Sequence, residues 1–219
     1  MADEVGHPTG MIACTDFCAP DIERMIELYR SVNRIRAVRQ HLAWHPTREL
    51  LRFAQAPDVL TDAAWRRGLT LVRNDDLACE IEIVATQLAD FTDVARSFPD
   101  QRLILPLMGW PIDLTEQGFS TWRNAMSALA HCENVVVKIF GAECIFGLNW
   151  RVAQIRPWVL TAIDLFTPGR CMFASHMPIA ALSRSIQDLF NAYGKIVEDF
   201  TSSERRSLFH DTAATTYRL

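Results

Sequence analysis

The segment CMFASHMP, residues 171–178, has the pattern of a buried strand that ends at a histidine. Residues 172–174 are apolar and suit a sheet core, whereas Pro178 lacks the amide hydrogen that a continuing strand would need. Ser175 and His176 are therefore expected at the carboxyl end of this strand. Where strands alternate with helices, the carboxyl ends of the strands carry the functional side chains. The fold and the function both depend on what surrounds His176.

Five further segments have the same apolar character. They are rich in Val, Ile and Leu and mostly lack strict polar alternation, which is typical of strands buried on both faces. Amphipathic stretches with helical spacing separate them, and Thr201 with Glu204 forms a capping box for a last short helix. The pattern predicts one α/β domain with parallel strands over residues 1–219, in which residues 1–10 form a flexible start. The five segments are MIACT (11–15), RIRAVRQ (34–40), CEIEIVAT (79–86), RLILPLM (102–108) and VVVKIF (135–140).

The composition argues against several classes of protein. The 219 residues are 49% hydrophobic with a formal net charge of −4, which gives no electrostatic attraction for nucleic acid or an anionic membrane. No apolar run is long enough to span a membrane, and the polar start MADEVGHPTG does not resemble a signal peptide. Six cysteines without a C-x-x-C pair indicate reduced thiols in a cytoplasmic protein. No glycine-rich phosphate loop follows a predicted strand, so no cofactor is expected.

Polar side chains gather near the ends of the other predicted strands. Parallel strands of a barrel end at one face, so these side chains are expected to line a common site with Ser175 and His176. Lys138 lies within a strand and must face a polar interior or a carboxylate to avoid being buried unpaired. The candidates are Arg39, His41, His45, Gln87, Trp110 and Lys138.

Several segments resemble the amidohydrolase-related family. They are AVRQHLAWHP (37–46), DAAWRRGL (62–69), NVVVKIFG (134–141), RCMFASHMP (170–178) and LFHDTAATTYRL (208–219). This family consists of metal-dependent hydrolases with a (β/α)8 or TIM barrel, and it includes lactone hydrolases that act on sugar lactones and pyrone dicarboxylates. The resemblance implies a TIM-barrel fold. With about six recognisable βα units, against the eight of a closed barrel, it is shortened or incomplete.

The chain departs from the family at the positions that hold the metal. The family begins with a strand that carries H-x-H, and nothing before residues 11–15 resembles it. Where the family has histidines on its fifth and sixth strands, this chain has Thr86 and Leu107. His176 stands where the family has an aspartate or asparagine. A hydrolytic metal needs about three protein ligands and an open position, so the matching positions predict no bound metal.

His176 and Arg39 are the candidate catalytic residues. With an unperturbed pKa of about 6.5, His176 could act as a general base at neutral pH, and Glu143 could orient its ring. It could instead bind substrate through a hydrogen bond, or be a structural histidine. The resemblance implies that Arg39 holds a carboxylate or carbonyl group of the substrate. The alternative for Arg39 is a salt bridge inside the barrel, to Glu80, Glu82 or Asp16.

Three functions remain open. The favoured one is a metal-independent enzyme that performs acid–base chemistry, as hydrolysis or as cyclisation or isomerisation, on a small anionic or carbonyl-bearing substrate. His176 and Arg39 would be catalytic, with substrate bound by Ser175, Gln87, His45, His41, Lys138 and Trp110. The second is a catalytically inactive barrel that serves as a binding or scaffolding subunit, with its old site plugged by Leu107, Met108 and Phe140. The third is a metal hydrolase with rearranged ligands, drawn from His41, His45, His176 and Glu143.

A shortened barrel would leave two open sheet edges and expose part of its interior. Large exposed apolar surfaces drive association. We therefore expect a homodimer, or a partner chain, that covers the open side. The expected ligand is a small molecule rather than nucleic acid or a membrane.

Overall fold

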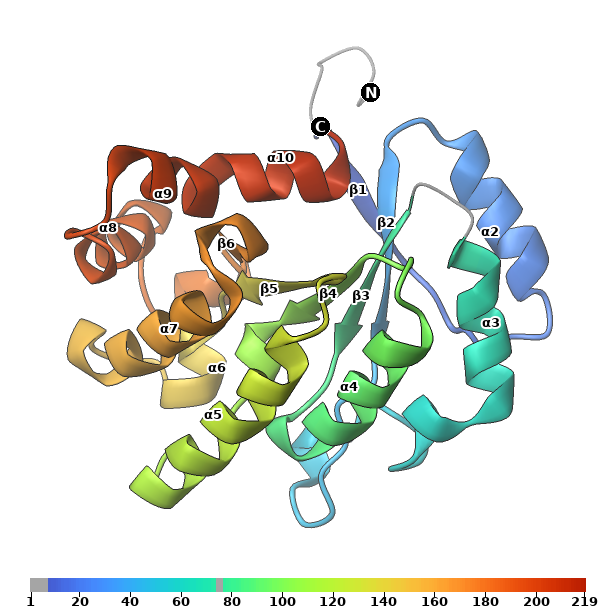
Figure 1. Cartoon of the computed structure of the whole chain (residues 1–219), viewed down its shortest axis with the longest axis horizontal. Coiled ribbons are helices and arrows are strands. Elements are labelled where there is room, and N and C mark those ends of the chain that lie inside the picture. The colour runs from blue at the N-terminus through green and yellow to red at the C-terminus, as the bar shows by residue number, and fades with distance from the viewer. Residues whose placement is uncertain (1–7, 74–76) are drawn as a thin grey trace.

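The computed structural model describes residues 8–73 and 77–219, and within them the strands form one parallel sheet. The strands follow one another across the sheet in chain order (Figure 1). Each overlaps a segment predicted from the apolar runs, so the α/β class and the shortened barrel are confirmed. Residues 1–7 of the predicted flexible start lie outside the described residues. The strands are β1 (Met11–Cys14), β2 (Ile35–His41), β3 (Ala78–Glu82), β4 (Leu103–Pro106), β5 (Val135–Ile139) and β6 (Cys171–Phe173).

A helix of at least ten residues follows each strand and packs on the sheet. These helices are α2 (Ile22–Ser31), α3 (Ala63–Arg73), α4 (Leu88–Ser97), α5 (Glu116–Ala130), α7 (Val152–Phe166) and α8 (Ile186–Ile196). Shorter helices are α6 (Ala142–Phe146), α9 (Ser202–Arg206), α10 (Thr212–Tyr217) and the π-helical turn η7 (Ser207–Asp211). Single 3-10 turns are η1 (Glu49–Leu51), η2 (Val59–Thr61), η3 (Ala85–Gln87), η4 (Leu107–Gly109), η5 (Pro168–Arg170) and η6 (Ile179–Leu182).

The main apolar core lies between the sheet and the helices. It includes Trp65 and Phe91, which have no exposed surface, and Trp122 and Trp158, whose rings lie 4.8 Å apart. Burying large aromatic side chains of this kind stabilises the fold by several kcal/mol each, about 3–5 by truncation to alanine. The same cluster extends along the chain from Phe17 to Leu208.

The other face of the sheet encloses the barrel interior, and the C-terminal helix α10 packs at the end where the strands begin. A small apolar layer fills the interior near the amino ends of the strands, and Tyr217 and Ala213 of α10 pack against it. In Figure 1, α10 lies beside the amino ends of β1 and β2. The predicted capping box is confirmed, because the Thr201 hydroxyl accepts the Glu204 amide and the Glu204 carboxylate accepts the Thr201 amide.

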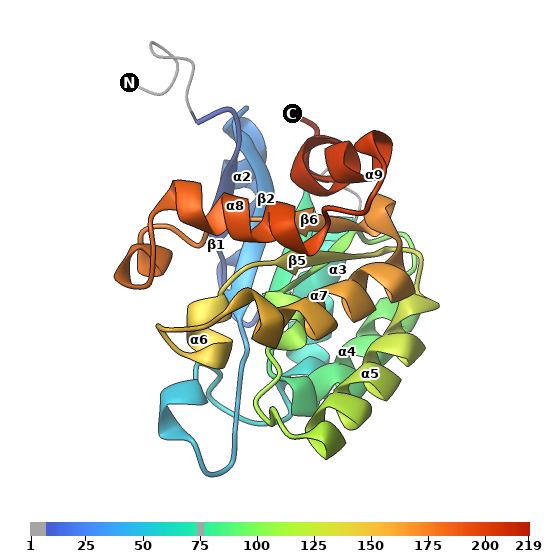
Figure 2. The same ribbon diagram turned by 90° about the vertical axis from the view of Figure 1, so that its left-hand side faces the viewer.

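The loops that follow the strands gather at the opposite end. The longest, residues 42–62 between β2 and α3, extends beyond the sheet in both views (Figures 1 and 2). Within the described residues β1 and β6 are the edge strands of the sheet. The homodimer or partner chain expected at this open side stays a prediction. In the described part of the chain, no helix combines the length and the apolar character that crossing a bilayer requires.

Gly68 tests how tightly α3 packs, and Gly194 in α8 is its control. Glycine to alanine inside a helix normally stabilises it by about 1 kcal/mol. At Gly68 an added Cβ would lie 2.0 Å from the Phe17 carbonyl oxygen, whereas at Gly194 in α8 it would meet nothing within 4 Å. We expect Gly68→Ala to lower the free energy of unfolding by about 1–3 kcal/mol through overpacking. Gly194→Ala should raise it by about 0.5–1 kcal/mol. Urea denaturation measures both, and stabilisation by both variants would contradict the close packing.

Candidate active site

A layer of charged side chains crosses the barrel interior. Arg39 of β2 and Glu80 of β3 are paired residues in the parallel register, and the guanidinium donates to the Glu80 carboxylate. The Lys138 ammonium lies 3.1 Å from the other Glu80 oxygen, and the Tyr217 hydroxyl donates to that same oxygen at 3.1 Å. Glu80 is fully buried. The structure therefore shows the salt-bridge alternative for Arg39, and it places Lys138 beside the carboxylate that its burial requires.

Burial changes the acid–base behaviour of this layer. Burial lowers the pKa of Lys138, and the negative charge of Glu80 opposes that shift without cancelling it. Burial also raises the pKa of Tyr217, and the nearby Glu80 carboxylate raises it further, so the phenol keeps its proton and donates it. The Nε of Arg39 has no hydrogen-bond partner within the described residues. One donor of Arg39 therefore remains uncommitted inside the barrel.

Gln87 holds two loops together. Its side-chain oxygen accepts the amides of Trp44 and Val84, at 3.0 and 3.1 Å, and its amide nitrogen donates to the Leu42 carbonyl at 2.9 Å. Its side chain is buried. These bonds give Gln87 a structural role in joining the loop after β2 to the loop after β3.

The two histidines after β2 have different surroundings. His41 donates to Glu82 at 2.9 Å, and its side chain is 39% exposed at the barrel mouth. The Nδ1 of His45 accepts the amides of Thr47 and Arg48, both at 3.2 Å, and so caps the turn that follows. His45 also lines a separate cavity of about 300 Å³ with Thr86. The structure does not gather His41 and His45 into one group with His176, as the rearranged metal site requires.

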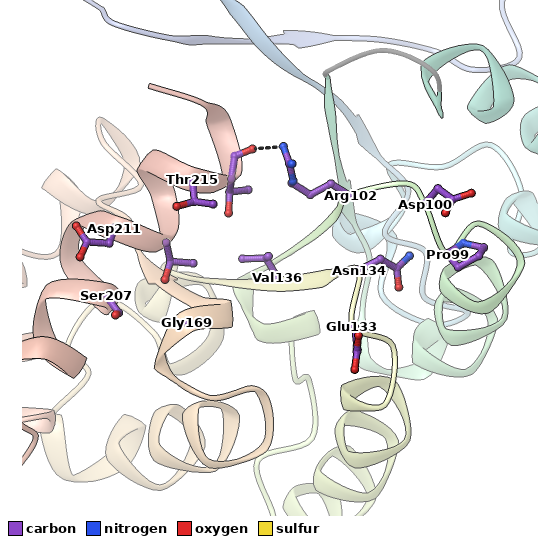
Figure 3. Close-up of a pocket in the computed structure, with 12 residues that line it drawn as sticks. Pro99, Asp100, Arg102, Glu133, Asn134, Val136, Gly169, Ser207, Asp211 and Thr215 are labelled. Carbon is purple, nitrogen blue, oxygen red and sulfur yellow. Dashed lines mark hydrogen bonds between the residues drawn. The ribbon is translucent and has the colours of Figure 1, made fainter.

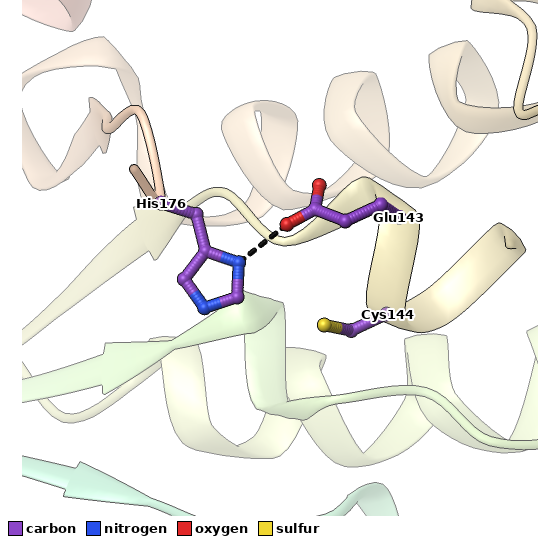
Figure 4. Close-up of side chains that lie close together, drawn as sticks. All are labelled: Glu143, Cys144 and His176. Carbon is purple, nitrogen blue, oxygen red and sulfur yellow. Dashed lines mark hydrogen bonds and ion pairs between the residues drawn. The ribbon is translucent and has the colours of Figure 1, made fainter. Parts of the chain in front are cut away.

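His176 lies just beyond β6 and is bonded to a buried carboxylate. Its Nδ1 donates to Glu143 Oε1 at 2.5 Å, and its ring packs on Phe140 with 4.8 Å between centroids (Figure 4). The Glu143 side chain is 2% exposed and that of His176 is 19% exposed. The Ser175 hydroxyl accepts the Met177 amide at 3.3 Å. Glu143 therefore orients His176, as considered from the sequence.

Gly141 makes this pairing possible. It turns the chain from β5 into α6 with a φ of +73°, a conformation that strongly favours glycine. A Cβ here would lie 2.6 Å from Leu107 Cδ2 and 3.7 Å from His176 Nδ1. A side chain at position 141 would crowd Leu107 and strain the start of α6, the helix that carries Glu143.

The surroundings change the protonation of His176. Burial lowers its pKa, but hydrogen bonds to Cys144 and Glu143 and the charge of Glu143 outweigh burial and raise the pKa to about 9. The ring is therefore an imidazolium at neutral pH. The carboxylate that orients the ring also stabilises its charge, so the ring must first lose a proton before it can act as a general base, and that role of His176 stays a prediction.

Cys144 is a site residue that the sequence alone did not identify. Its thiol, a ring nitrogen of His176 and a Glu143 oxygen all lie within 4.8 Å of one another. In Figure 4 the thiol is directed toward the imidazole, and the residue is exposed. The signal in the sequence that could have identified Cys144 was the segment GAEC, residues 141–144, directly after the predicted strand 135–140.

The rest of the barrel mouth is apolar. Leu107 and Phe140 are buried there in one cluster with Trp110, Val84 and Ala43. Met108 was expected in the same plug, but it packs in the outer core instead, where its carbonyl accepts the Trp122 indole N–H at 2.9 Å. Two of the three plug residues proposed for an inactive barrel are therefore at the mouth, and Met108 is not.

Backbone conformations at the mouth are unusual. Leu107, Met108 and Trp110 have φ values of +51°, +54° and +42°, and His176 has +56°. Side chains other than glycine disfavour this region, and such residues cluster at functional sites. The strained positions lie at the carboxyl ends of β4 and β6, where barrel proteins build their sites.

A cavity of about 590 Å³ opens beside the plug. Cys144 and Trp110 line it, as does Arg48 from the loop after β2. The remaining lining residues are Thr47, Glu49, Leu50, Leu51, Pro111, Ile112 and Ile145. Of the predicted substrate-binding residues, the structure places Trp110 at this cavity.

A second cavity of about 590 Å³ lies at the other end of the barrel (Figure 3). Arg102, Asn134 and Val136 line one side of it, and Asp211 and Thr215 of the C-terminal helices line the other. None of the predicted site residues borders it. Because it lies at the amino ends of the strands, it is not where this fold places its chemistry.

The fold is an incomplete α/β barrel, and His176 with Glu143 and Cys144 lies just beyond the carboxyl ends of its last two strands. The amidohydrolase family profile (Amidohydro_2) matches residues 1–219, so the chain belongs to the amidohydrolase family. The protein y4mH of Sinorhizobium fredii is 35% identical over 219 residues, which cover 100% of this chain and 73% of that protein. The L-fucono-1,5-lactonase of Burkholderia multivorans is 24% identical over 231 residues, which cover 100% of this chain and 74% of the lactonase.

Solved structures share the fold. A Burkholderia multivorans amidohydrolase with bound zinc superposes with a TM-score of 0.87 at 24% identity, covering 100% of this chain and 76% of the other. A putative 2-pyrone-4,6-dicarboxylic acid hydrolase from Pseudomonas putida superposes with a TM-score of 0.73 at 17% identity. That match covers 94% of this chain and 71% of the other. The resemblance inferred from the sequence is confirmed.

The mouth holds one group of possible metal ligands beside apolar side chains. Leu107, at a position where the sequence resemblance implied a metal-binding histidine, is buried in the apolar plug. Among the described residues, Glu143, Cys144 and His176 are the one group of three potential metal ligands within reach of one another. Glu143 and His176 are bonded to each other, so a cation held by this group would have to replace their hydrogen bond.

Removing the Glu80 carboxylate should destabilise the protein strongly. Glu80→Ala leaves Arg39 and Lys138 inside the barrel without their shared partner, and breaking a buried ion pair costs about 3–5 kcal/mol. The matched control is Asp93→Ala, whose carboxylate pairs with Arg66 but is 63% exposed. We expect the control to cost less than about 1 kcal/mol. Equal losses in urea denaturation would show that the interior layer does not hold the barrel together.

The pKa of His176 should depend on Glu143. We expect NMR titration to give a pKa of about 9 in the wild type and a lower value in Glu143→Gln, while Glu198→Gln on the surface leaves it unchanged. Because the folded pKa lies above the value of about 6.5 for a free histidine, protonation stabilises the fold. This contribution is complete below pH 6.5 or so and is lost as the pH rises through about 9. A wild-type pKa near 6.5 would contradict the pairing.

Proposed function

We propose that the protein hydrolyses a small carbonyl compound, of the lactone or ester type, at the barrel mouth without a metal ion. The observation that carries the proposal is the hydrogen bond between His176 and the buried Glu143 at the carboxyl end of β6. Membership of a hydrolase family supports the reaction class. The similarity to an L-fucono-1,5-lactonase supports a lactone as substrate.

The protonated His176 supplies the acid–base chemistry. Its pKa of about 9 leaves the imidazolium ready to donate a proton to the leaving oxygen, and Glu143 stabilises its charge until then. Once it has lost that proton, the neutral ring can accept one from water. One residue therefore acts first as acid and then as base, and Glu143 keeps the ring in place throughout.

The cavity beside Cys144 suits a small anionic substrate. Arg48 can bind a carboxylate through its planar fork of donors, and Trp110 offers an apolar surface against a ring. This assignment moves the anion-binding role expected of Arg39 to Arg48, because Arg39 is bonded to Glu80. Lys138 and Gln87 serve the architecture around the site.

An inactive barrel that binds a small molecule is the second candidate. The buried Leu107 and Phe140 favour it, because they occupy the mouth where relatives need polar groups. Such a protein would bind ligands in the cavity lined by Arg48 and Trp110 and leave them unchanged.

Hydrolysis of a panel of sugar lactones and dicarboxylate lactones by the chelator-treated protein tests the proposal. We expect turnover that His176→Gln lowers by about 10²–10⁴-fold, because an acid–base group is lost. His210→Gln is the matched control, since His210 lies on the surface beside Asp211 with its side chain 69% exposed. Equal activity of both variants would rule out His176, and activity that returns only with added zinc would rule out the metal-free reaction. Ligand binding without turnover would favour the inactive barrel.

A further inference from the structure

We propose that Cys144 is the nucleophile of this site and that hydrolysis proceeds through a thioester on its sulfur. The proposal rests on the proposed function and deepens it. Cys144, His176 and Glu143 form a nucleophile, an acid–base group and an orienting carboxylate, an arrangement that activates thiols in unrelated hydrolases.

The short helix α6 places the two neighbours on different sides. Glu143 and Cys144 are consecutive, and consecutive helical side chains diverge by about 100°. Glu143 is therefore turned inward, where it is 2% exposed and bonded to His176 Nδ1, while Cys144 is exposed. The thiol stays within 4.8 Å of the imidazole (Figure 4).

Cys144 also faces the cavity. It is the member of the trio that lines the space of about 590 Å³ with Trp110 and Arg48. A carbonyl compound held there meets the sulfur, and a ring nitrogen of His176 lies within 4.8 Å of that sulfur. This arrangement suits attack by sulfur followed by proton transfer from His176.

The other cysteines lack this environment. Cys79, Cys132 and Cys171 are buried, and burial raises the pKa of Cys79 and of Cys171. Cys18 is an exposed residue, but partial burial of its thiol raises the pKa of that thiol. Two nearby carboxylates raise the pKa further. A thiol beside an imidazolium is more reactive, because the positive charge favours the nucleophilic thiolate. Within the described residues, Cys144 is the cysteine grouped with a histidine and a carboxylate.

The reaction balances without an added reagent. The Cys144 thiolate attacks the carbonyl carbon, a C–S bond forms, the acyl C–O bond breaks, and the His176 imidazolium protonates the leaving oxygen. The neutral imidazole then takes a proton from water, and the resulting hydroxide attacks the thioester carbonyl. The C–S bond breaks and the thiolate and imidazolium are restored. The net change is the addition of one water to one lactone or ester.

Acylation by p-nitrophenyl acetate tests the proposal. We expect a burst of p-nitrophenol and one acetyl group per chain in the intact mass, located on Cys144 by peptide mapping. Cys144→Ala should lose the acetyl group and lower turnover by at least about 10²-fold. Cys18→Ala is the matched control because it removes another exposed thiol. We expect this variant to keep both the acetyl group and the turnover of the wild type. Thermal unfolding near that of the wild type shows that Cys144→Ala still folds.

The outcomes separate the two proposals. If Cys144→Ala keeps turnover while His176→Gln loses it, Cys144 is not the nucleophile and the acid–base function stands. If both variants keep turnover, both proposals fail. An acetyl group on another residue overturns the assignment. The assignment is also overturned if elemental mass spectrometry finds one zinc ion per wild-type chain and none in Cys144→Ala, because Cys144 would then be a metal ligand.

Discussion

The Glu80 carboxylate is the interaction on which the barrel depends. It binds Arg39 of β2, Lys138 of β5 and Tyr217 of α10, and so connects three separate parts of the fold through one buried group. These bonds fix the spacing of β2, β3 and β5 at mid-barrel. The loop after β2 and the helix α6 start from the ends of those strands, so the positions of the mouth cavity and of Glu143 follow from this layer.

The chain has the architecture of the amidohydrolase family, and its barrel mouth is partly apolar. Leu107 and Phe140 form an apolar wall there. The polar groups lie instead on α6 and just after β6, where Glu143, Cys144 and His176 meet. An apolar wall lowers the local dielectric constant, and this strengthens the hydrogen bond between the His176 ring and the Glu143 carboxylate.

The sequence predicted the strands well because each is a short apolar run with no competing periodicity. It also required a polar interior or a carboxylate near Lys138, because a charged side chain inside a strand cannot be buried alone, and Glu80 is that carboxylate. The mouth was harder to predict. Leu107 and Met108 both have a positive φ, a conformation that the apolar pattern does not predict, and Met108 packs in the outer core while Leu107 packs at the mouth. Cys144 depends on a one-turn helix whose start is set by Gly141 against Leu107, a contact between distant segments that local spacing cannot show.

The reach of Tyr217 into the barrel has a consequence for how the protein folds. Its hydroxyl binds a carboxylate 137 residues earlier in the chain, a contact of very high sequence separation. Contacts of this kind form late, because a long loop must close before they return any energy. Until α10 docks, Glu80 lacks one of its three partners, and the layer at the amino ends of the strands lacks the contacts of Ala213 and Tyr217. Docking of α10 therefore completes both the bonds of Glu80 and the cover of this end of the interior.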